Sequence, residues 1–112
     1  MNDPTAEFFQ GLEGRGQDPL LQRVNGTMRF DVVDGKRTSR WFVTVKDGAA
    51  KVSRQGTESD CVVRADKRLL GGIVSGKVNA FAAALRGEVD VEGDPELLVL
   101  FQRLLPAAGS RS

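Results

Sequence analysis

The feature that most constrains this chain is an alternation of apolar and polar residues that runs from about residue 25 to residue 66. A period of two places neighbouring side chains on opposite faces of a β-strand. The pattern is interrupted by Asp34-Gly35 and Asp47-Gly48, which are typical of tight hairpin turns. The alternating segments are 27–33, 40–46, 49–54 and 60–65. They predict an antiparallel meander of four strands with one apolar face and one polar, largely basic face.

The polar face of the predicted sheet carries six basic residues: Arg29, Arg40, Lys46, Lys51, Arg54 and Arg64. A solvated face is the favoured interpretation, and an anionic partner or a transient contact with a membrane surface is the alternative. Phe42 is the one aromatic residue predicted on this face, whereas sheets that bind RNA stack bases on several aromatic rings. The net charge of the whole chain is only +1. We therefore expect no nucleic-acid partner.

Helical patterns precede and follow the four predicted strands along the sequence. A capping Asp or Asn precedes each of five helix starts, at Asp3, Asp18, Asp66, Asn79 and Asp94. Gly71-Gly72 inside one helical pattern favours a short or irregular helix, and the alternative is that the backbone there approaches a ligand or the sheet. The order of elements is a helical N-terminal region, four strands, two helices, a strand and a last helix. This order predicts an α+β fold with helices on the apolar face of a mixed sheet.

The segment 88-EVDVEGD-94 has acidic residues at alternate positions, as in the first half of a calcium-binding EF-hand loop. Such a loop needs a glutamate at its twelfth position, which is occupied here by Val99. Val89 and Val91 are β-branched and favour a strand. We therefore predict a fifth strand over 88–92 with its carboxylates in water, and no metal site.

The composition argues against the common kinds of active site. The chain has no histidine, the usual general base and the most frequent transition-metal ligand. Cys61 is the single cysteine, so neither an internal disulfide nor a cysteine-based zinc site is expected. We expect a protein that is not an enzyme and needs no cofactor. An unpaired cysteine, with no signal pattern and no apolar run of membrane-spanning length, predicts a cytoplasmic location.

The last predicted helix, 95–105, is apolar on almost every side. Its polar residues after the initial proline are Glu96, Gln102 and Arg103, whereas a surface helix needs an apolar stripe of about 100°. The additional apolar surface can pack in the core, against a second copy of the chain in a homodimer, or against an apolar ligand.

In this order, the segments resemble the sterol carrier protein type 2 domain, also called the sterol-transfer domain. The resemblance runs from about Leu20 to Leu105 and includes a strand with tryptophan in 30-FDVVDGKRTSRWFVTV-45, followed by Asp47-Gly48. The next part is 59-SDCVVRADKRLLGGIVSGKVNAFAAALRGEVDVEGDPELLVLFQRLL-105. It is similar to the family's strand, helix, Ser/Thr-Gly-Lys, Ala-rich helix, Gly-x-Val-x-Val-x-Gly-Asp and Leu-rich final helix.

The resemblance implies a five-stranded mixed, largely antiparallel sheet with helices on one face, in a single domain over 1–106 with a flexible tail at 107–112. It implies a non-catalytic carrier that holds a sterol, fatty acid or acyl-CoA in an apolar tunnel between sheet and helices. The positions that match the tunnel lining are Trp41, Val43, Ile73, Phe81, Leu85, Phe101 and Leu104. The alternative is a dimerisation or protein-interaction module of the same fold, without a lipid and with its tunnel filled by its own aromatic side chains.

Overall fold

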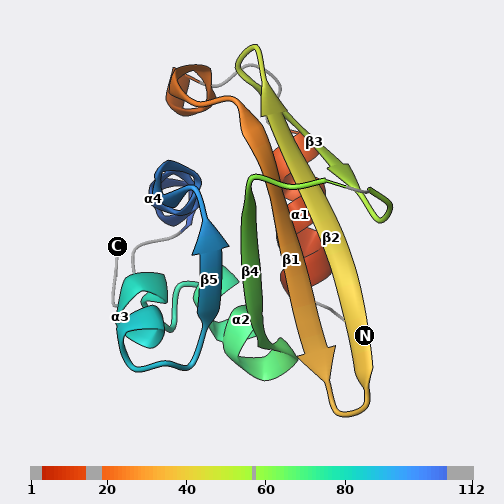
Figure 1. The fold of residues 1–112 in the computed structure, drawn as a ribbon, viewed down its shortest axis with the longest axis vertical. Helices are drawn as coiled ribbons and strands as arrows, with labels where there is room; N and C mark the ends of the chain where they lie inside the picture. The colour runs from red at the N-terminus through yellow and green to blue at the C-terminus, as the bar shows by residue number, and fades with distance from the viewer. Residues whose placement is uncertain (1–3, 15–18, 57, 106–112) are drawn as a thin grey trace.

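A five-stranded sheet lies at the centre of the computed structural model, which describes residues 4–14, 19–56 and 58–105 (Figure 1). The strands are β1 (Gly26–Asp34), β2 (Arg37–Lys46), β3 (Ala49–Ser53), β4 (Cys61–Asp66) and β5 (Asp90–Gly93). Their order across the sheet is β3-β2-β1-β4-β5. The sheet is mixed and mostly antiparallel, which confirms the predicted α+β class.

The helical elements are α1 (Pro4–Gly14), the 3₁₀ helix η1 (Pro19–Arg23), α2 (Lys67–Val74), α3 (Ala80–Leu85) and α4 (Pro95–Leu104). The side chains of Asp66, Asn79 and Asp94 each accept a hydrogen bond of 2.9 Å from a backbone N–H in the first turn of the helix that follows. These three predicted caps are confirmed. The other two predicted caps, Asp3 and Asp18, lie outside the described residues, as does the predicted tail at 107–112.

The fourth strand does not continue the antiparallel meander, so that part of the prediction is wrong. β1 pairs with β2, and β2 with β3, in antiparallel register. β4 instead pairs in parallel with β1, from Met28 opposite Cys61 to Val33 opposite Asp66. The alternation in 60–65 shows which side chains face the core, but it carries no information about which strand lies next to β4.

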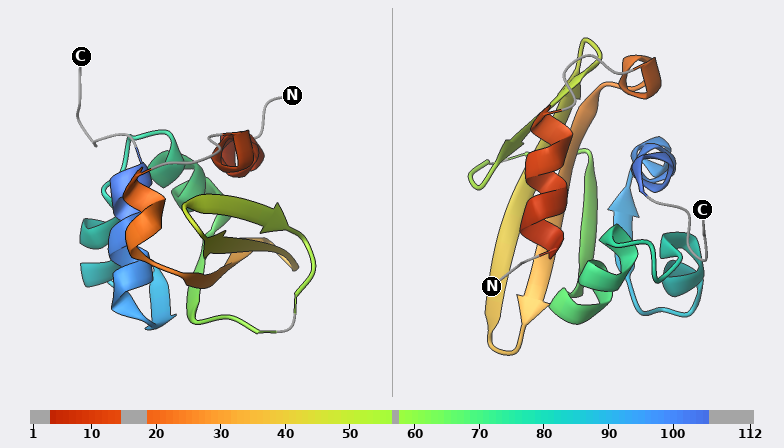
Figure 2. Two further views of the ribbon diagram at one scale, coloured as in Figure 1. Left: turned by 90° about the horizontal axis from the view of Figure 1, so that it is seen from above. Right: turned by 180° about the vertical axis from the view of Figure 1, so that it is seen from behind.

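The two faces of the sheet have different coverings. Helices α1, α2 and α4 lie over the inner face, which carries Met28, Phe30 and Val32, while the connection from β3 to β4 crosses the outer face (Figure 2). This connection covers Phe42, which is only 7% exposed. A Cβ atom added at Gly56 would lie 2.8 Å from the Phe42 ring, so the backbone packs directly on that ring. The outer face is therefore partly apolar and partly covered.

The acidic segment forms a strand that runs directly into a helix, as predicted, although β5 begins two residues later than expected. Val89 is buried just before β5, and the side chains of Glu88, Asp90 and Glu92 are exposed. Gly93 has a φ of +104°, and a Cβ atom there would lie 2.9 Å from the Cα of Cys61. Only glycine satisfies both conditions at this turn.

Candidate ligand site between the sheet and the helices

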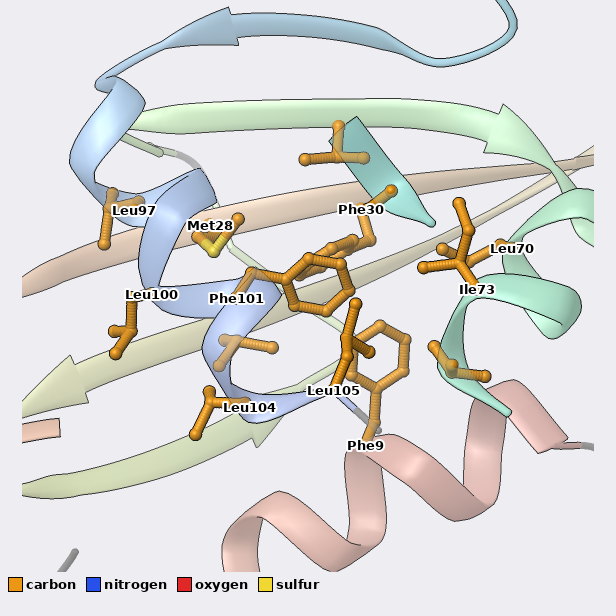
Figure 3. Packing of buried hydrophobic residues seen from close by; sticks show 14 of the residues in the cluster. Phe9, Met28, Phe30, Leu70, Ile73, Leu97, Leu100, Phe101, Leu104 and Leu105 are labelled. Atoms are coloured by element: carbon orange, nitrogen blue, oxygen red, sulfur yellow. The ribbon is translucent and has the colours of Figure 1, made fainter. Parts of the chain in front are cut away.

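Aromatic rings fill the space between the inner face of the sheet and the helices (Figure 3). The centroid of Phe30, from β1, lies 4.9 Å from that of Phe9 in α1 and 4.8 Å from that of Phe101 in α4. Phe8 extends the cluster, with its centroid 5.7 Å from that of Phe101. Phe9, Phe30 and Phe101 are each at most 2% exposed. Three elements that are distant in the sequence thus meet through one set of rings.

Flexible aliphatic side chains surround this aromatic cluster. They come from β1, α2, α4 and the residue that follows α4, and include Met28, Leu70, Ile73, Leu97, Leu100, Leu104 and Leu105 (Figure 3). Leucine and methionine can change rotamer without polar cost, so they adapt to the shape of a neighbouring group. The surroundings are suited to an apolar occupant.

The structure brings together most of the predicted lining residues. Val43, Ile73, Phe101 and Leu104 are buried in the main core, and Trp41 is half-buried against it. The Trp41 ring stacks on Phe9, with centroids 4.9 Å apart and planes inclined by 26°. Whether these residues line a tunnel stays a prediction.

The two predicted lining residues of α3 lie apart from this core. Phe81 is 39% exposed and Leu85 is 89% exposed. α3 has only six residues, and it turns Ala80 and Ala83 inward. Phe81 and Leu85 are four positions apart on another side of the helix, so the same helical period that buries the alanines exposes them.

Phe9 and Phe30 were not predicted as site residues from the sequence. A signal was present for Phe30, because the alternation in 27–33 places it on the apolar face beside Met28 and Val32. For Phe9 the sequence shows only an apolar pair in a helical segment. Which member of that pair enters the core depends on how α1 crosses the sheet, which is a tertiary property.

On the outer face, Asp31 is 3% exposed and surrounded by three arginines. The Arg29 guanidinium donates two hydrogen bonds of 3.0 Å to its carboxylate. Arg40 Nε lies 3.5 Å and Arg64 Nη1 4.0 Å from the same carboxylate. Part of the basic character of this face is therefore neutralised within the sheet.

Arg54 does not belong to that face, and its assignment there is corrected. Its guanidinium carbon lies 4.1 Å from the centroid of the Trp41 ring, on the inner side of the sheet. Side chains two residues apart along an extended chain point to the same face, and Arg54 lies two residues after the half-buried Val52. The contact is a cation–π interaction.

The lone cysteine is a buried structural residue. Cys61 is 1% exposed, and burial raises the pKa of its thiol, with further increases from the charges of Asp94 and Asp60. A raised pKa lowers the fraction of reactive thiolate. Within 4–14, 19–56 and 58–105, no group of three or more His, Cys, Asp or Glu side chains is placed to hold a metal ion. No helix in these ranges has the length and apolar character needed to cross a membrane.

Known proteins share this fold. Sterol carrier protein 2 of Bos taurus is 29% identical over 102 residues, which cover 88% of this chain and 18% of that protein. The chain thus spans about a fifth of the length of the curated relatives it matches. The solution structure of sterol carrier protein domain 2 of Helicoverpa armigera superposes with a TM-score of 0.77 at 24% identity, covering 97% of this chain and 91% of that one.

A second solved structure was determined with a bound lipid. It is sterol carrier protein-2 from Aedes aegypti in complex with palmitate, with a TM-score of 0.73 at 20% identity, covering 95% of this chain and all (100%) of that one. The family model for the SCP-2 sterol transfer family matches residues 8–106, which include every strand and almost all of the helical structure. The chain therefore belongs to the SCP-2 sterol transfer family.

Proposed function

We propose that this protein binds a long-chain lipid, such as a fatty acid or a sterol, between the inner face of the sheet and helices α1, α2 and α4, and carries it without chemical change. The observation that carries the proposal is the aromatic cluster, where three separately connected elements meet through Phe9, Phe30 and Phe101. Membership in the SCP-2 sterol transfer family supports it. So does the Aedes aegypti relative, whose structure contains palmitate.

Burial of the lipid chain would supply the binding energy. At about 25 cal/mol per Å², burying roughly 300 Å² of apolar ligand surface stabilises the complex by about 7 kcal/mol before entropy losses. The aromatic cluster opposes entry, because Phe101 must separate from Phe8 and Phe30 to admit a chain. Each such ring pair contributes about 0.5–1.5 kcal/mol beyond its buried area. A stabilisation of about 7 kcal/mol corresponds to a Kd of about 10 μM, so these costs are expected to leave a net Kd of tens of micromolar or weaker.

Ligand entry requires one covering helix to move, and α4 is suited to this. A single turn leads into α4: the chain changes direction at Gly93, and Asp94 caps the helix. The buried side of α4 includes Leu97, Leu100 and Phe101. A small rotation about the Gly93 turn would lift this side from the sheet and open the aromatic cluster.

Lipid that co-purifies with the protein tests the proposal most directly. The purified protein is extracted with organic solvent, and the extract is analysed by mass spectrometry beside size-exclusion chromatography of the intact protein. We expect a detectable lipid together with a monomer, in less than stoichiometric amount because a complex of this affinity loses ligand during purification. A protein free of lipid that also fails to bind added palmitate or cholesterol would contradict the proposal.

A pair of variants tests where the lipid lies. Phe101→Leu removes one ring from the inner cluster, and we expect it to bind palmitate about fivefold more tightly, because about 1 kcal/mol of ring contacts no longer has to be broken. Phe42→Leu is the matched control, since Phe42 is similarly buried but lies on the outer face. Both affinities are measured by titration of Trp41 fluorescence. Equal changes in the two variants would place the lipid elsewhere.

A dimerisation or interaction module is the second candidate, and exposed apolar side chains on α3 favour it. Leu85 is 89% exposed and Phe81 39% exposed. Light scattering on the eluting protein distinguishes the two candidates. A wild-type dimer that becomes a monomer in Leu85→Ser, with no lipid in either protein, would support the module.

A further inference from the structure

At one end of the sheet α1 begins, β1 turns into β2, and α2 starts (Figure 1). Two adjoining cavities are lined by residues at this end. One has a volume of about 640 Å³ and the other of about 210 Å³. Thr5, Asp34 and Lys67 line both of them. The two cavities therefore adjoin, and we call them together the basic mouth.

The basic mouth has an excess of positive charge. Its charged lining consists of Arg37, Arg54, Lys67, Arg68, Lys77, Asp34 and Asp66. Five cations against two carboxylates give a formal charge of +3. Asp34 pairs with Lys67 at 3.8 Å, and the Asp66 carboxylate accepts from the backbone N–H of Arg68. Neither Arg68 nor Lys77 forms an ion pair with any residue that the structure describes.

The basic mouth leads toward the aromatic cluster. Val32 and Trp41 line its smaller cavity. The Trp41 ring stacks on Phe9, and Phe9 in turn contacts Phe30, with centroids 4.9 Å apart in both pairs. The Arg54 guanidinium lies over Trp41 at 4.1 Å. The row of apolar rings thus begins at Trp41, in contact with the positive charge of Arg54.

Gly71 and Gly72 give the larger cavity a wall without side chains. The Gly72 carbonyl accepts hydrogen bonds from the backbone N–H groups of Lys77 and Val78, at 2.8 and 3.1 Å. The segment after α2 therefore folds back on the helix and brings Lys77 to the cavity. A Cβ atom at Gly72 would lie 2.9 Å from Val78 Cγ2. A larger residue at this position would therefore force the Val78 side chain to shift.

We propose that the basic mouth binds the anionic headgroup, a carboxylate or a phosphate, of a lipid whose chain lies along Trp41 and Phe9. Arg68 and Lys77 supply cations that no described carboxylate neutralises, and the Arg54 guanidinium marks the boundary between headgroup and chain. The inference rests on the proposed lipid binding and adds the charge class of the ligand. This site was not predicted from the sequence, because its cations come from four separate segments.

The test compares two probes of equal chain length, palmitate and the uncharged alcohol that corresponds to it. Trp41 is the only tryptophan, and the chain has no tyrosine, so intrinsic fluorescence reports binding beside the basic mouth. The test variant is R68Q/K77Q. The control is K46Q/K51Q, which removes the same charge from two exposed lysines that line neither cavity.

We expect R68Q/K77Q to lose about tenfold in affinity for palmitate and nothing for the alcohol, since hydrogen bonds to charged groups contribute on that scale. K46Q/K51Q should bind both probes as the wild type does. If R68Q/K77Q binds palmitate unchanged, or loses both probes equally, the headgroup assignment is overturned while lipid binding stands. Failure of the wild type to bind either probe overturns both proposals.

A further comparison distinguishes a lipid headgroup from a free anion. Acetate and inorganic phosphate carry the charge without a chain, so neither should displace palmitate at concentrations at which palmitate saturates the protein. Displacement by either salt, beyond the effect of sodium chloride at equal ionic strength, would show a site for a small anion and overturn the assignment.

Discussion

Asp31 supports the sheet from its outer face, and replacing it with asparagine should destabilise the protein markedly. Asp31→Asn keeps the size and shape of the side chain but removes its negative charge. Three arginines then face one another without the carboxylate that they surround. Because Asp31 is 3% exposed, water has little access to the position of the lost carboxylate charge and cannot take over its contacts with the arginines.

The expected loss of stability in Asp31→Asn follows from the contacts between the carboxylate and the three arginines. The two hydrogen bonds from Arg29, at 3.0 Å each, are charge-assisted, and each contributes about 1.5 kcal/mol at the lower end of the usual range. Arg40 and Arg64 are at least half exposed, so each of their contacts adds no more than about 0.5 kcal/mol. The asparagine oxygen recovers one neutral hydrogen bond of about 1 kcal/mol. We therefore expect the free energy of unfolding to fall by about 2–3 kcal/mol, which lowers Tm by about 10 °C.

Urea denaturation followed by Trp41 fluorescence measures this loss. The control is Asp34→Asn in the same strand, where the carboxylate is 65% exposed and its pair with Lys67 spans 3.8 Å. That change should cost less than about 0.5 kcal/mol. Added salt should partly restore the Asp31 variant, because it screens the repulsion among the arginines. If Asp31→Asn is as stable as Asp34→Asn, the reasoning about the buried carboxylate is refuted.

Two further predictions concern the junction between β4 and α4. Gly93→Ala should lower the free energy of unfolding by more than about 3 kcal/mol, because φ is +104° there and the added Cβ would meet the backbone at the start of β4. The control is Gly87→Ala, which has a φ of +79° but open space around it and should lose about 1 kcal/mol in the same urea assay. Similar losses in the two variants would contradict the steric argument. Burial raises the pKa of the Cys61 thiol above that of an unfolded thiol, so the native state retains its proton longer and stability should decrease as the pH rises above about 8.5. Comparison of Cys61→Ala with the wild type between neutral and alkaline pH checks this, and parallel pH profiles would count against it.

Local features of the fold could be read from the sequence. Alternation identified all five strands to within a few residues, and the caps at Asp66, Asn79 and Asp94 were predicted correctly. These features depend on neighbouring residues alone. The order of the elements predicted helices over the apolar face of a mixed sheet, and the family resemblance implied the same arrangement.

Features that depend on distant contacts could not be read in this way. The parallel pairing of β4 with β1 follows from the path of the chain across the sheet. The exposure of Leu85 follows from how the short helix α3 meets the core. The basic mouth joins residues of β2, the end of β3, α2 and the segment after it, so no stretch of sequence shows its charge.

The parallel pairing of β1 with β4 also has a consequence for folding kinetics. β1, β2 and β3 are joined by short turns, and such hairpins close within microseconds. Thr27 and Asp60, at the start of the parallel pair, are 33 positions apart and joined by two hydrogen bonds of 2.8 and 2.9 Å. Closing that longer loop is slower, so we expect the hairpins to precede β4.

The last part of the chain depends on this slow step. The backbone N–H of Asp94 donates to the Asp60 carbonyl at 2.8 Å, so α4 is held in place only after β4 has docked. Substitutions in β1–β3 should therefore slow folding, while those in β5 and α4 should mainly speed unfolding. Reversing only the final step would detach β5 and α4 from a sheet in which β1 to β4 remain paired. If the protein binds the proposed lipid, the same partial reversal would provide a route for its release.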